Sequence, residues 1–341
     1  MLFILLCSVI CEKDELTQSM VQEPVNDVAI TNKGVSCSIK NLVENVKVPA
    51  VKANVKTRSK PYSYSNYSTK AKSTTNDINE LTDSEKIIYG SCGKSVNYKF
   101  NTSSGELVIS GSGYMDSFYQ SPWYKYKNDI QSVVIEYGVT SISAYAFSDL
   151  SNMSIVKIAA SVTSINDCAF QHNQKLASII IPDEVKYIGE SAFKLCSELM
   201  YVNLSIGITS IGVSTFERCE KLSSIIIPEN VTSIGSNAFF KSGLTSIYIP
   251  KNVGNIGSYA FMSCFKLEAI NVSIENQAYM SKEGVLLSHN GTILYVCPCN
   301  KRGRYSIPYG VNTIEENAFY NCSELSYIYS VFCLWDQKVC V

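Results

Sequence analysis

The chain has 341 residues, of which 46% are hydrophobic, and its 29 basic and 30 acidic side chains leave a formal net charge of -1. This hydrophobic fraction allows a substantial core, and the length allows one or two domains. The balanced charge gives no electrostatic basis for a nucleic-acid partner or a strongly acidic ligand.

The first segment, Met1 to Cys11, is almost wholly apolar and is followed by charged residues. It resembles the apolar core of a secretory signal peptide, although the basic leader is missing. It is shorter than the roughly 20 apolar residues that span a bilayer, and no later stretch reaches that length. We therefore expect an extracellular or cell-surface protein with no transmembrane segment. If residues 1–11 are not a working signal, an intracellular scaffold is the alternative.

Residues 12–85 are rich in Lys, Ser, Thr and Asn and show no sustained apolar period. This composition predicts a disordered or flexible linker, with a Tyr-rich adhesive segment at 59–70 as the alternative. In residues 86–129, alternating apolar runs at 96–100 and 106–110 flank a Ser-Ser-Gly turn. They predict an N-terminal β-hairpin cap, in which Trp123 and Tyr124 seal one end of the core that follows.

An Ala-Phe pair recurs through residues 130–330, with Thr in place of the Ala in one copy. The spacings between the first six copies are 23, 23, 23, 23 and 22 residues, and the phenylalanines are Phe147, Phe170, Phe193, Phe216, Phe239, Phe261 and Phe319. An Ile stands five residues before each Phe, and a Val or Ile stands eight before it. A Val/Ile-x-Ile/Leu/Val triplet marks one strand in each repeat, from Val133 to Val272.

A repeat of about 23 residues cannot bury its own apolar face, but it suffices for one coil of a stack. The period therefore predicts a repeat solenoid, α/β-type or mainly β, of the leucine-rich-repeat kind. About nine parallel strands would form a sheet on one face. Glycines follow the core Ile in four repeats, and we expect them to let the backbone bend away from the strand, at Gly189, Gly212, Gly235 and Gly257.

One repeat is longer than the others. Residues 273–304 contain two apolar runs on either side of Asn290-Gly291, which predicts an insertion hairpin with a tight turn. This insertion either serves binding or is a spacer. The tail, residues 331–341, would act as a minimal cap, or the chain is a shortened member of its family. An uncovered last coil would instead expose a strand edge and allow self-stacking into a structural assembly.

The repeat Val231-Thr-Ser-Ile-Gly-Ser-Asn-Ala-Phe239 resembles that of the BspA-like (Treponema pallidum-type) leucine-rich-repeat surface proteins of bacteria and parasitic protists. The resemblance extends over residues 86–330 and includes the leader unit at 90–123 and the longer coil around 284–287. It implies an extracellular or cell-surface protein that takes part in adhesion. Its partners would then be proteins or glycans on host cells, matrix or other microbes. The missing transmembrane tail departs from anchored relatives and puts stable surface attachment in doubt.

No motif of the chain indicates catalysis, a cofactor or a metal. Four cysteines stand three residues after the repeat Phe, where we expect buried apolar fillers rather than a metal or redox site: Cys196, Cys219, Cys264 and Cys322. Cys297-Pro298-Cys299 has one intervening residue, unlike structural zinc spacing, and predicts a local disulfide or surface thiols. His172 and His289 lie in predicted turns, where solvation is favoured over a role as general base.

The middle residues of the strand triplets should point out of the coil because strand side chains alternate between faces. They are the candidate protein-binding face: Lys157, Ile180, Asn203, Ile226, Tyr248 and Asn271. Ile180, Ile226 and Tyr248 would form an interrupted apolar stripe of the kind that marks a protein contact. The alternative is that these are ordinary strand residues chosen for their fit to a pleated backbone.

Overall fold

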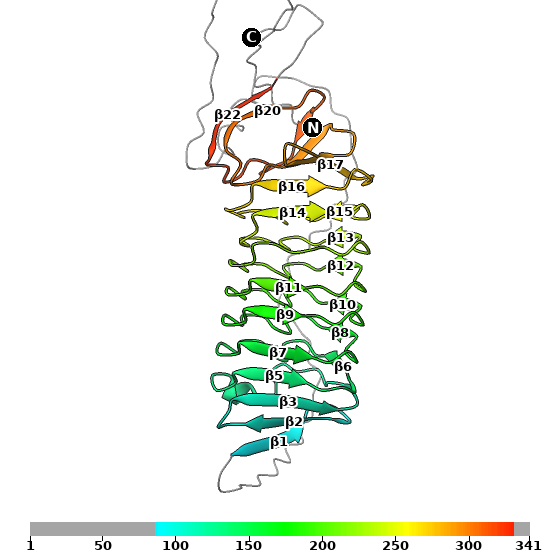
Figure 1. Ribbon diagram of the computed structural model, residues 1–341, viewed down its shortest axis with the longest axis vertical. Coiled ribbons are helices and arrows are strands. Elements are labelled where there is room, and N and C mark those ends of the chain that lie inside the picture. The colour runs from blue at the N-terminus through cyan, green and yellow to red at the C-terminus, as the bar shows by residue number, and fades with distance from the viewer. Residues whose placement is uncertain (1–85, 331–341) are drawn as a thin grey trace, which may run out of the picture.

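The computed structural model describes residues 86–330, which form a column of stacked coils (Figure 1). Nearly all of their regular structure is strand, and one 3-10 turn, η3 (Tyr124–Tyr126), is the helical element among them. The repeat solenoid is therefore confirmed, in its mainly β form. Within residues 86–330 no helix is long and apolar enough to cross a membrane. The predicted signal peptide, linker and tail lie outside the described residues.

The N-terminal unit is joined to the column through a five-stranded sheet with the order β1-β2-β3-β5-β7. The first two pairings are antiparallel and the last two parallel. The strands are β1 (Ile87–Ser91), β2 (Val96–Asn101), β3 (Glu106–Gly111), β5 (Ser132–Ile135) and β7 (Ile155–Ile158). Trp123 is buried and stacks on Phe147 with 5.4 Å between ring centroids, while its Nε1 donates to the Ala146 carbonyl. This ring covers the end of the repeat core.

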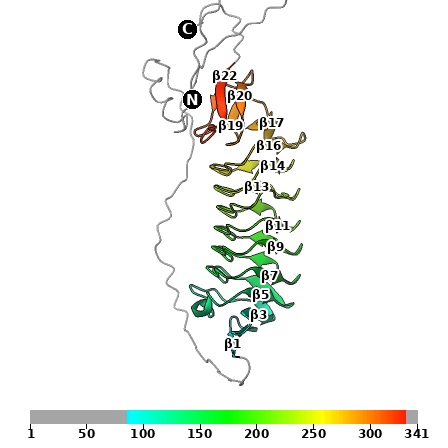
Figure 2. The same cartoon turned by 60° about the vertical axis from the view of Figure 1, so that its left-hand side comes forward.

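The regular coils form two columns of short strands, which Figures 1 and 2 show running along the molecule. The front column continues through β9 (Ser178–Ile180), β11 (Tyr201–Asn203), β14 (Ser246–Ile249) and β16 (Ala269–Val272). The second column comprises β4 (Gly113–Tyr114), β6 (Val139–Ile142), β8 (Ser164–Ile165), β10 (Tyr187–Ile188), β12 (Ser210–Ile211), β13 (Ser233–Ile234) and β15 (Asn255–Ile256).

Strand pairing between successive regular coils is parallel and in register, so that Ile142 lies beside Ile165 and Val202 beside Ile179. The front sheet is not continuous. Its hydrogen-bonded ladder breaks between β7 and β9, and the triplet at residues 225–227 has no strand assignment. The predicted parallel sheet therefore exists as short segments that follow one another along a single face.

The core of the column is a stack of phenylalanines. Six rings, from Phe147 to Phe261, lie face to face with 5.4 to 5.8 Å between centroids. The turn that carries each ring from Phe147 to Phe239 is held by the next coil, as where the Phe170 N–H donates to the Ala192 carbonyl at 2.9 Å. The residues two before and two after each of these rings have a positive φ, for example Ser191 at 57° and Leu195 at 64°. Coil-to-coil hydrogen bonds thus hold non-glycine residues in the left-handed region.

The expectation for the repeat glycines was wrong. None of the four has a positive φ, so they are not needed for a backbone bend. A Cβ at Gly235 would lie 2.6 Å from the Gly212 carbonyl carbon, and one at Gly257 would lie 2.4 Å from the Ser236 nitrogen. Glycine is required there because the backbone of the preceding coil passes too close for a side chain.

The long repeat interrupts the stack. Its strands β17 (Tyr279–Lys282), β18 (Val285–Ser288) and β19 (Ile293–Val296) form an antiparallel meander. The chain continues through β20 (Gly303–Ile307), β21 (Thr313–Ile314) and β22 (Leu325–Ser330), in which β20 pairs with β22 and β21 with β19. Within the described part of the chain no further ring stacks on Phe261, and Phe319 instead packs at a tilt against Tyr305. A second, smaller core therefore forms at this end.

Candidate functional site

All six residues of the candidate protein-binding face are exposed. Parallel register places Asn203 beside Ile180 and Asn271 beside Tyr248. The neighbours before and after each of them in the triplet point toward the core, as with buried Ile247 and Ile249 around Tyr248. The structure thus brings the six side chains to the outer side of the front column.

Two further apolar side chains on this side were missed by the sequence analysis. Ile155 is 52% exposed and Tyr201 is 56% exposed, each two residues before a triplet's middle residue. Strand residues i and i+2 share a face. The same alternation would therefore have predicted that Ile155 and Tyr201 point outward if the first position of each strand had been considered.

Together these side chains form the front stripe, which we define as Ile155, Ile180, Tyr201, Ile226 and Tyr248. Each of five consecutive coils exposes one of them. The fractional exposure runs from 51% at Tyr248 to 86% at Ile226. With about 4.8 Å between stacked coils, the stripe extends over roughly 19 Å. Polar neighbours such as Ser178 and Asn203 flank it, which gives the apolar centre and polar surround typical of a protein contact.

The two histidines have different surroundings. His172 Nδ1 lies 2.7 Å from Asp149 Oδ1, one coil away, and Nε2 lies 3.1 Å from Gln174. This contact follows from the 23-residue spacing of His172 and Asp149, which stacks equivalent turns, and the sequence analysis did not predict it. His289 lies in the loop between β18 and β19, and its backbone N–H donates to the Ala278 carbonyl.

The cysteines after the repeat Phe are buried, and their thiols hydrogen-bond to the preceding coil. Cys196 Sγ donates to the Phe170 carbonyl at 3.2 Å, and Cys264 Sγ donates to the Phe239 carbonyl at 3.0 Å. Burial raises the pKa of both thiols to about 12. Within residues 86–330, no group of three or more His, Cys, Asp or Glu side chains is arranged to hold a metal ion.

The expectation for Cys297 and Cys299 was wrong. Both are buried and neither forms a disulfide. The Cys297 N–H donates to the Ala318 carbonyl at 2.7 Å, and Cys299 Sγ lies 3.6 Å from the Tyr320 carbonyl oxygen. The Cys-Pro-Cys segment therefore runs between two coils where a repeat turn would lie. The Cys-x-Cys spacing does not indicate this position between coils, because the segments that pack against the two cysteines are distant in sequence.

Six copies of the BspA type leucine rich repeat region are found in the chain, at residues 119–242, 199–283 and 296–331. These segments cover more than half of the sequence. This chain belongs to the BspA-type leucine-rich-repeat family. The family resemblance that the repeat signature indicated is thereby confirmed.

Solved leucine-rich-repeat proteins are similar to this BspA-type chain. One, from Eubacterium ventriosum, is 29% identical with a TM-score of 0.50, and the match covers 72% of this chain and 60% of that one. A leucine rich cell surface protein from Faecalibacterium prausnitzii is 26% identical with a TM-score of 0.48, over 70% of this chain and 69% of that one. The chain thus spans about three fifths of the length of the first of these proteins. No curated protein matches its sequence.

The buried thiols of the BspA-type repeats lead to a prediction. At pH 8, iodoacetamide should label the half-buried Cys168 in the folded protein well before Cys196, Cys219 and Cys264. The thiolate is the reacting species, and burial both raises the pKa of these three thiols and blocks access. Peptide mapping by mass spectrometry after timed labelling measures each site, and in urea all four should react at similar rates. Equal labelling in the folded protein would show that the column is not closed.

Proposed function

We propose that this BspA-type chain is an extracellular or cell-surface binding module that holds a partner protein through the front stripe. The supporting observation is that five consecutive coils each expose one large apolar side chain on the same face. Covering an Ile or Tyr of this kind gains on the order of 1–2 kcal/mol. Five such contacts in a row suffice for the apolar centre of a protein interface once polar contacts surround it.

A protein surface suits the stripe better than a glycan does. Three of its five side chains are Ile, which offers neither a hydrogen-bond donor nor an acceptor. Burying such side chains against apolar groups is favourable, and a partner's own Leu, Met or aromatic residues provide those groups. The proposed role is therefore adhesion to a protein on a host cell, in matrix or on another microbe. Export through residues 1–11 is part of the proposal.

The test compares two double variants with the unchanged protein. Ile226→Asp with Tyr248→Asp places two charges on the stripe, while Ile274→Asp with Tyr309→Asp places the same charges on exposed residues outside it. Each protein is titrated onto immobilised purified matrix proteins and onto a glycan array. We expect saturable capture by a matrix protein that falls at least tenfold in the stripe variant only. Circular dichroism should be the same for all three proteins.

Two results would contradict the proposal. Binding to glycans alone, or an equal loss in the control variant, would remove the stripe as the contact surface. The remaining alternative is self-assembly, for which light scattering supplies the measurement. A molar mass that rises with concentration, and does so only while the stripe is intact, would assign this face to contacts between copies of the chain.

A further inference from the structure

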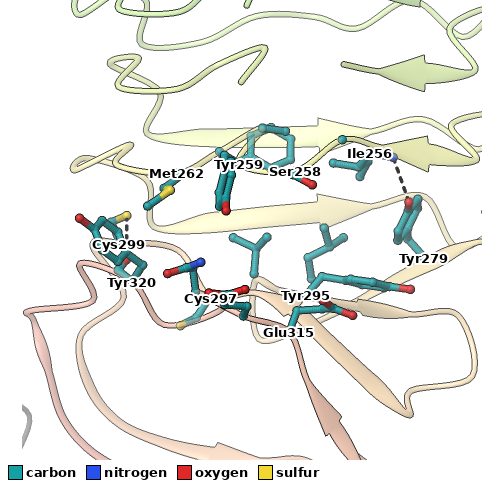
Figure 3. Close-up of a pocket in the computed structure, with 17 residues that line it drawn as sticks. Ile256, Ser258, Tyr259, Met262, Tyr279, Tyr295, Cys297, Cys299, Glu315 and Tyr320 are labelled. Atoms are coloured by element: carbon teal, nitrogen blue, oxygen red, sulfur yellow. Dashed lines mark hydrogen bonds between the residues drawn. The ribbon is translucent and has the colours of Figure 1, made fainter. Parts of the chain in front are cut away.

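A cleft of about 350 Å3 opens where the regular coils meet the long repeat (Figure 3). One wall is the turn at residues 256–262 of the last regular coil. The opposite wall is the turn at 315–320, and residues 295–299 of the long repeat lie between them. The cleft is distinct from the front stripe, since none of the stripe residues lines it.

The cleft exists because the turn of the long repeat is two residues short. In a regular coil the core Ile and the Phe are five positions apart, as with Ile234 and Phe239. In the long repeat, Leu294 pairs with Ile314 as a core Ile would. In a regular coil the N–H of the repeat Phe donates to the Ala carbonyl of the next coil. In the long repeat the Cys297 N–H takes this role and donates to the Ala318 carbonyl. Only three positions separate Leu294 from Cys297, so the shorter turn leaves space below the last regular coil.

This shortening leaves backbone donors without acceptors. One coil earlier, the Asn237 N–H donates to the Ser258 carbonyl at 3.0 Å and the Phe239 N–H to the Ala260 carbonyl at 2.9 Å. The equivalent N–H groups of Tyr259 and Phe261 have no acceptor within residues 86–330. Both residues line the cleft, so a ligand carbonyl can accept from each N–H, at a net gain of about 0.5–1.5 kcal/mol for each hydrogen bond.

A side chain of the long repeat serves one neighbouring donor. The Tyr279 hydroxyl accepts from the Ile256 N–H at 2.9 Å, a contact drawn in Figure 3. The two remaining donors, on Tyr259 and Phe261, are two residues apart. In each regular coil that spacing is matched by two carbonyls of the turn in the next coil, themselves two residues apart with a residue of positive φ between them. The wall therefore presents two N–H groups from which two carbonyls of a peptide, two residues apart, can accept.

The walls of the cleft carry negative charge and aromatic rings. Glu315 and Glu316 are exposed, and neither forms an ion pair with a residue of the described chain. Tyr259, Tyr295 and Tyr320 also line the cleft, whereas no Lys, Arg or His does. Figure 3 shows Tyr259 on the upper wall and Tyr295 with Glu315 on the lower one. Carboxylates and tyrosine faces both attract a cation.

We propose that this cleft binds an extended peptide segment of a second protein that carries a lysine or arginine side chain. Two carbonyls of the peptide accept from the Tyr259 and Phe261 N–H groups. The basic side chain lies against Glu315 and Glu316 and the tyrosine rings. The volume is near the lower end of the roughly 300–1,000 Å3 of ligand sites, so the cleft takes a few residues rather than a folded surface.

The probe is a fluorescein-labelled, end-blocked hexapeptide of alternating Val and Lys, with matched peptides in which norleucine or Glu replaces Lys. Fluorescence anisotropy should show the Lys peptide binding at least ten times more tightly than the norleucine peptide, and no binding of the Glu peptide. Glu315→Gln with Glu316→Gln should weaken the Lys peptide at least tenfold. Glu184→Gln with Glu229→Gln, which removes the same charge from exposed sites outside the cleft, should leave its affinity unchanged.

Amide hydrogen exchange tests the backbone contacts. The Lys peptide should slow exchange at Tyr259 and Phe261 and leave Asn237 unchanged, because the latter is already bonded to Ser258. Absence of binding, binding that survives the double Gln variant, or binding without this protection would each overturn the proposal. The Ile226→Asp, Tyr248→Asp variant should bind the peptide as the unchanged protein does, so failure of one proposal leaves the other intact.

Discussion

Phe193→Ala is expected to lower the free energy of unfolding by about 3–5 kcal/mol. Phe193 is fully buried, and its ring lies between those of Phe170 and Phe216, 5.6 Å from each and almost parallel to both. Removing it deletes two stacked contacts and leaves a cavity in the middle of the column. Neighbouring coils cannot close this cavity, because their own backbone hydrogen bonds fix the distance between coils.

Urea unfolding followed by circular dichroism measures this loss. Phe193→Leu keeps most of the apolar volume and should cost clearly less, and Phe319→Ala should also cost less because that ring contacts only Tyr305 among the aromatic residues described. Each coil contacts only its neighbours, so the three substitutions act locally. The order of the three losses in free energy of unfolding is therefore a sharper test than their absolute size. A loss from Phe319→Ala as large as that from Phe193→Ala would show that the stack is not the main source of stability.

Asn173→Leu is expected to destabilise the protein by about 2–5 kcal/mol, although the two side chains are similar in volume. Asn173 is fully buried, and its Oδ1 accepts from the Leu150 N–H. Its Nδ2 donates to the carbonyls of Phe147 and Phe170, each at 2.9 Å. Leucine offers none of these contacts, so three buried backbone groups would lose a partner in one substitution.

The matched control is Cys196→Leu, at the equivalent position of the next coil. The Cys196 thiol donates one hydrogen bond, to the Phe170 carbonyl, so its loss should cost less than that of Asn173 even though leucine is larger than cysteine. Thermal and urea unfolding of the two variants side by side give the comparison. If both lose the same stability, packing volume rather than hydrogen bonding decides what this position tolerates.

The repeat fold could be predicted from the sequence because its apolar positions keep one register. A Phe, with an Ile five residues before it and a strand triplet, recurs in seven copies, and only stacked coils bury all of them together. The outward position of Lys157 and Ile226 followed from strand alternation in the same way. Residues 273–304 were recognised as an enlarged repeat, but the strand β17 within them was not foreseen.

Other features could not be predicted because they depend on contacts between coils. The repeat glycines follow the core Ile in the sequence, yet at Gly235 and Gly257 the backbone of the preceding coil is the reason for them. In the sequence, Cys297 and Cys299 resemble a surface pair. The structure shows that the turn at residues 318–320 lies against them. In each case the contacting residue lies about 20 residues away in the sequence. No single repeat therefore shows how close it lies in space.

The period, the buried set and the face on which the proposed binding residues lie can be predicted from the sequence, since these follow from which positions repeat. The front stripe and the cleft beside the long repeat arise only in the folded chain. The stripe needs the coils in parallel register, which places Ile155 and Tyr201 on the same face as Ile180 and Ile226, two residues earlier along the strand. The cleft needs a turn that is two residues too short to reach the coil before it, which leaves two backbone donors facing open space.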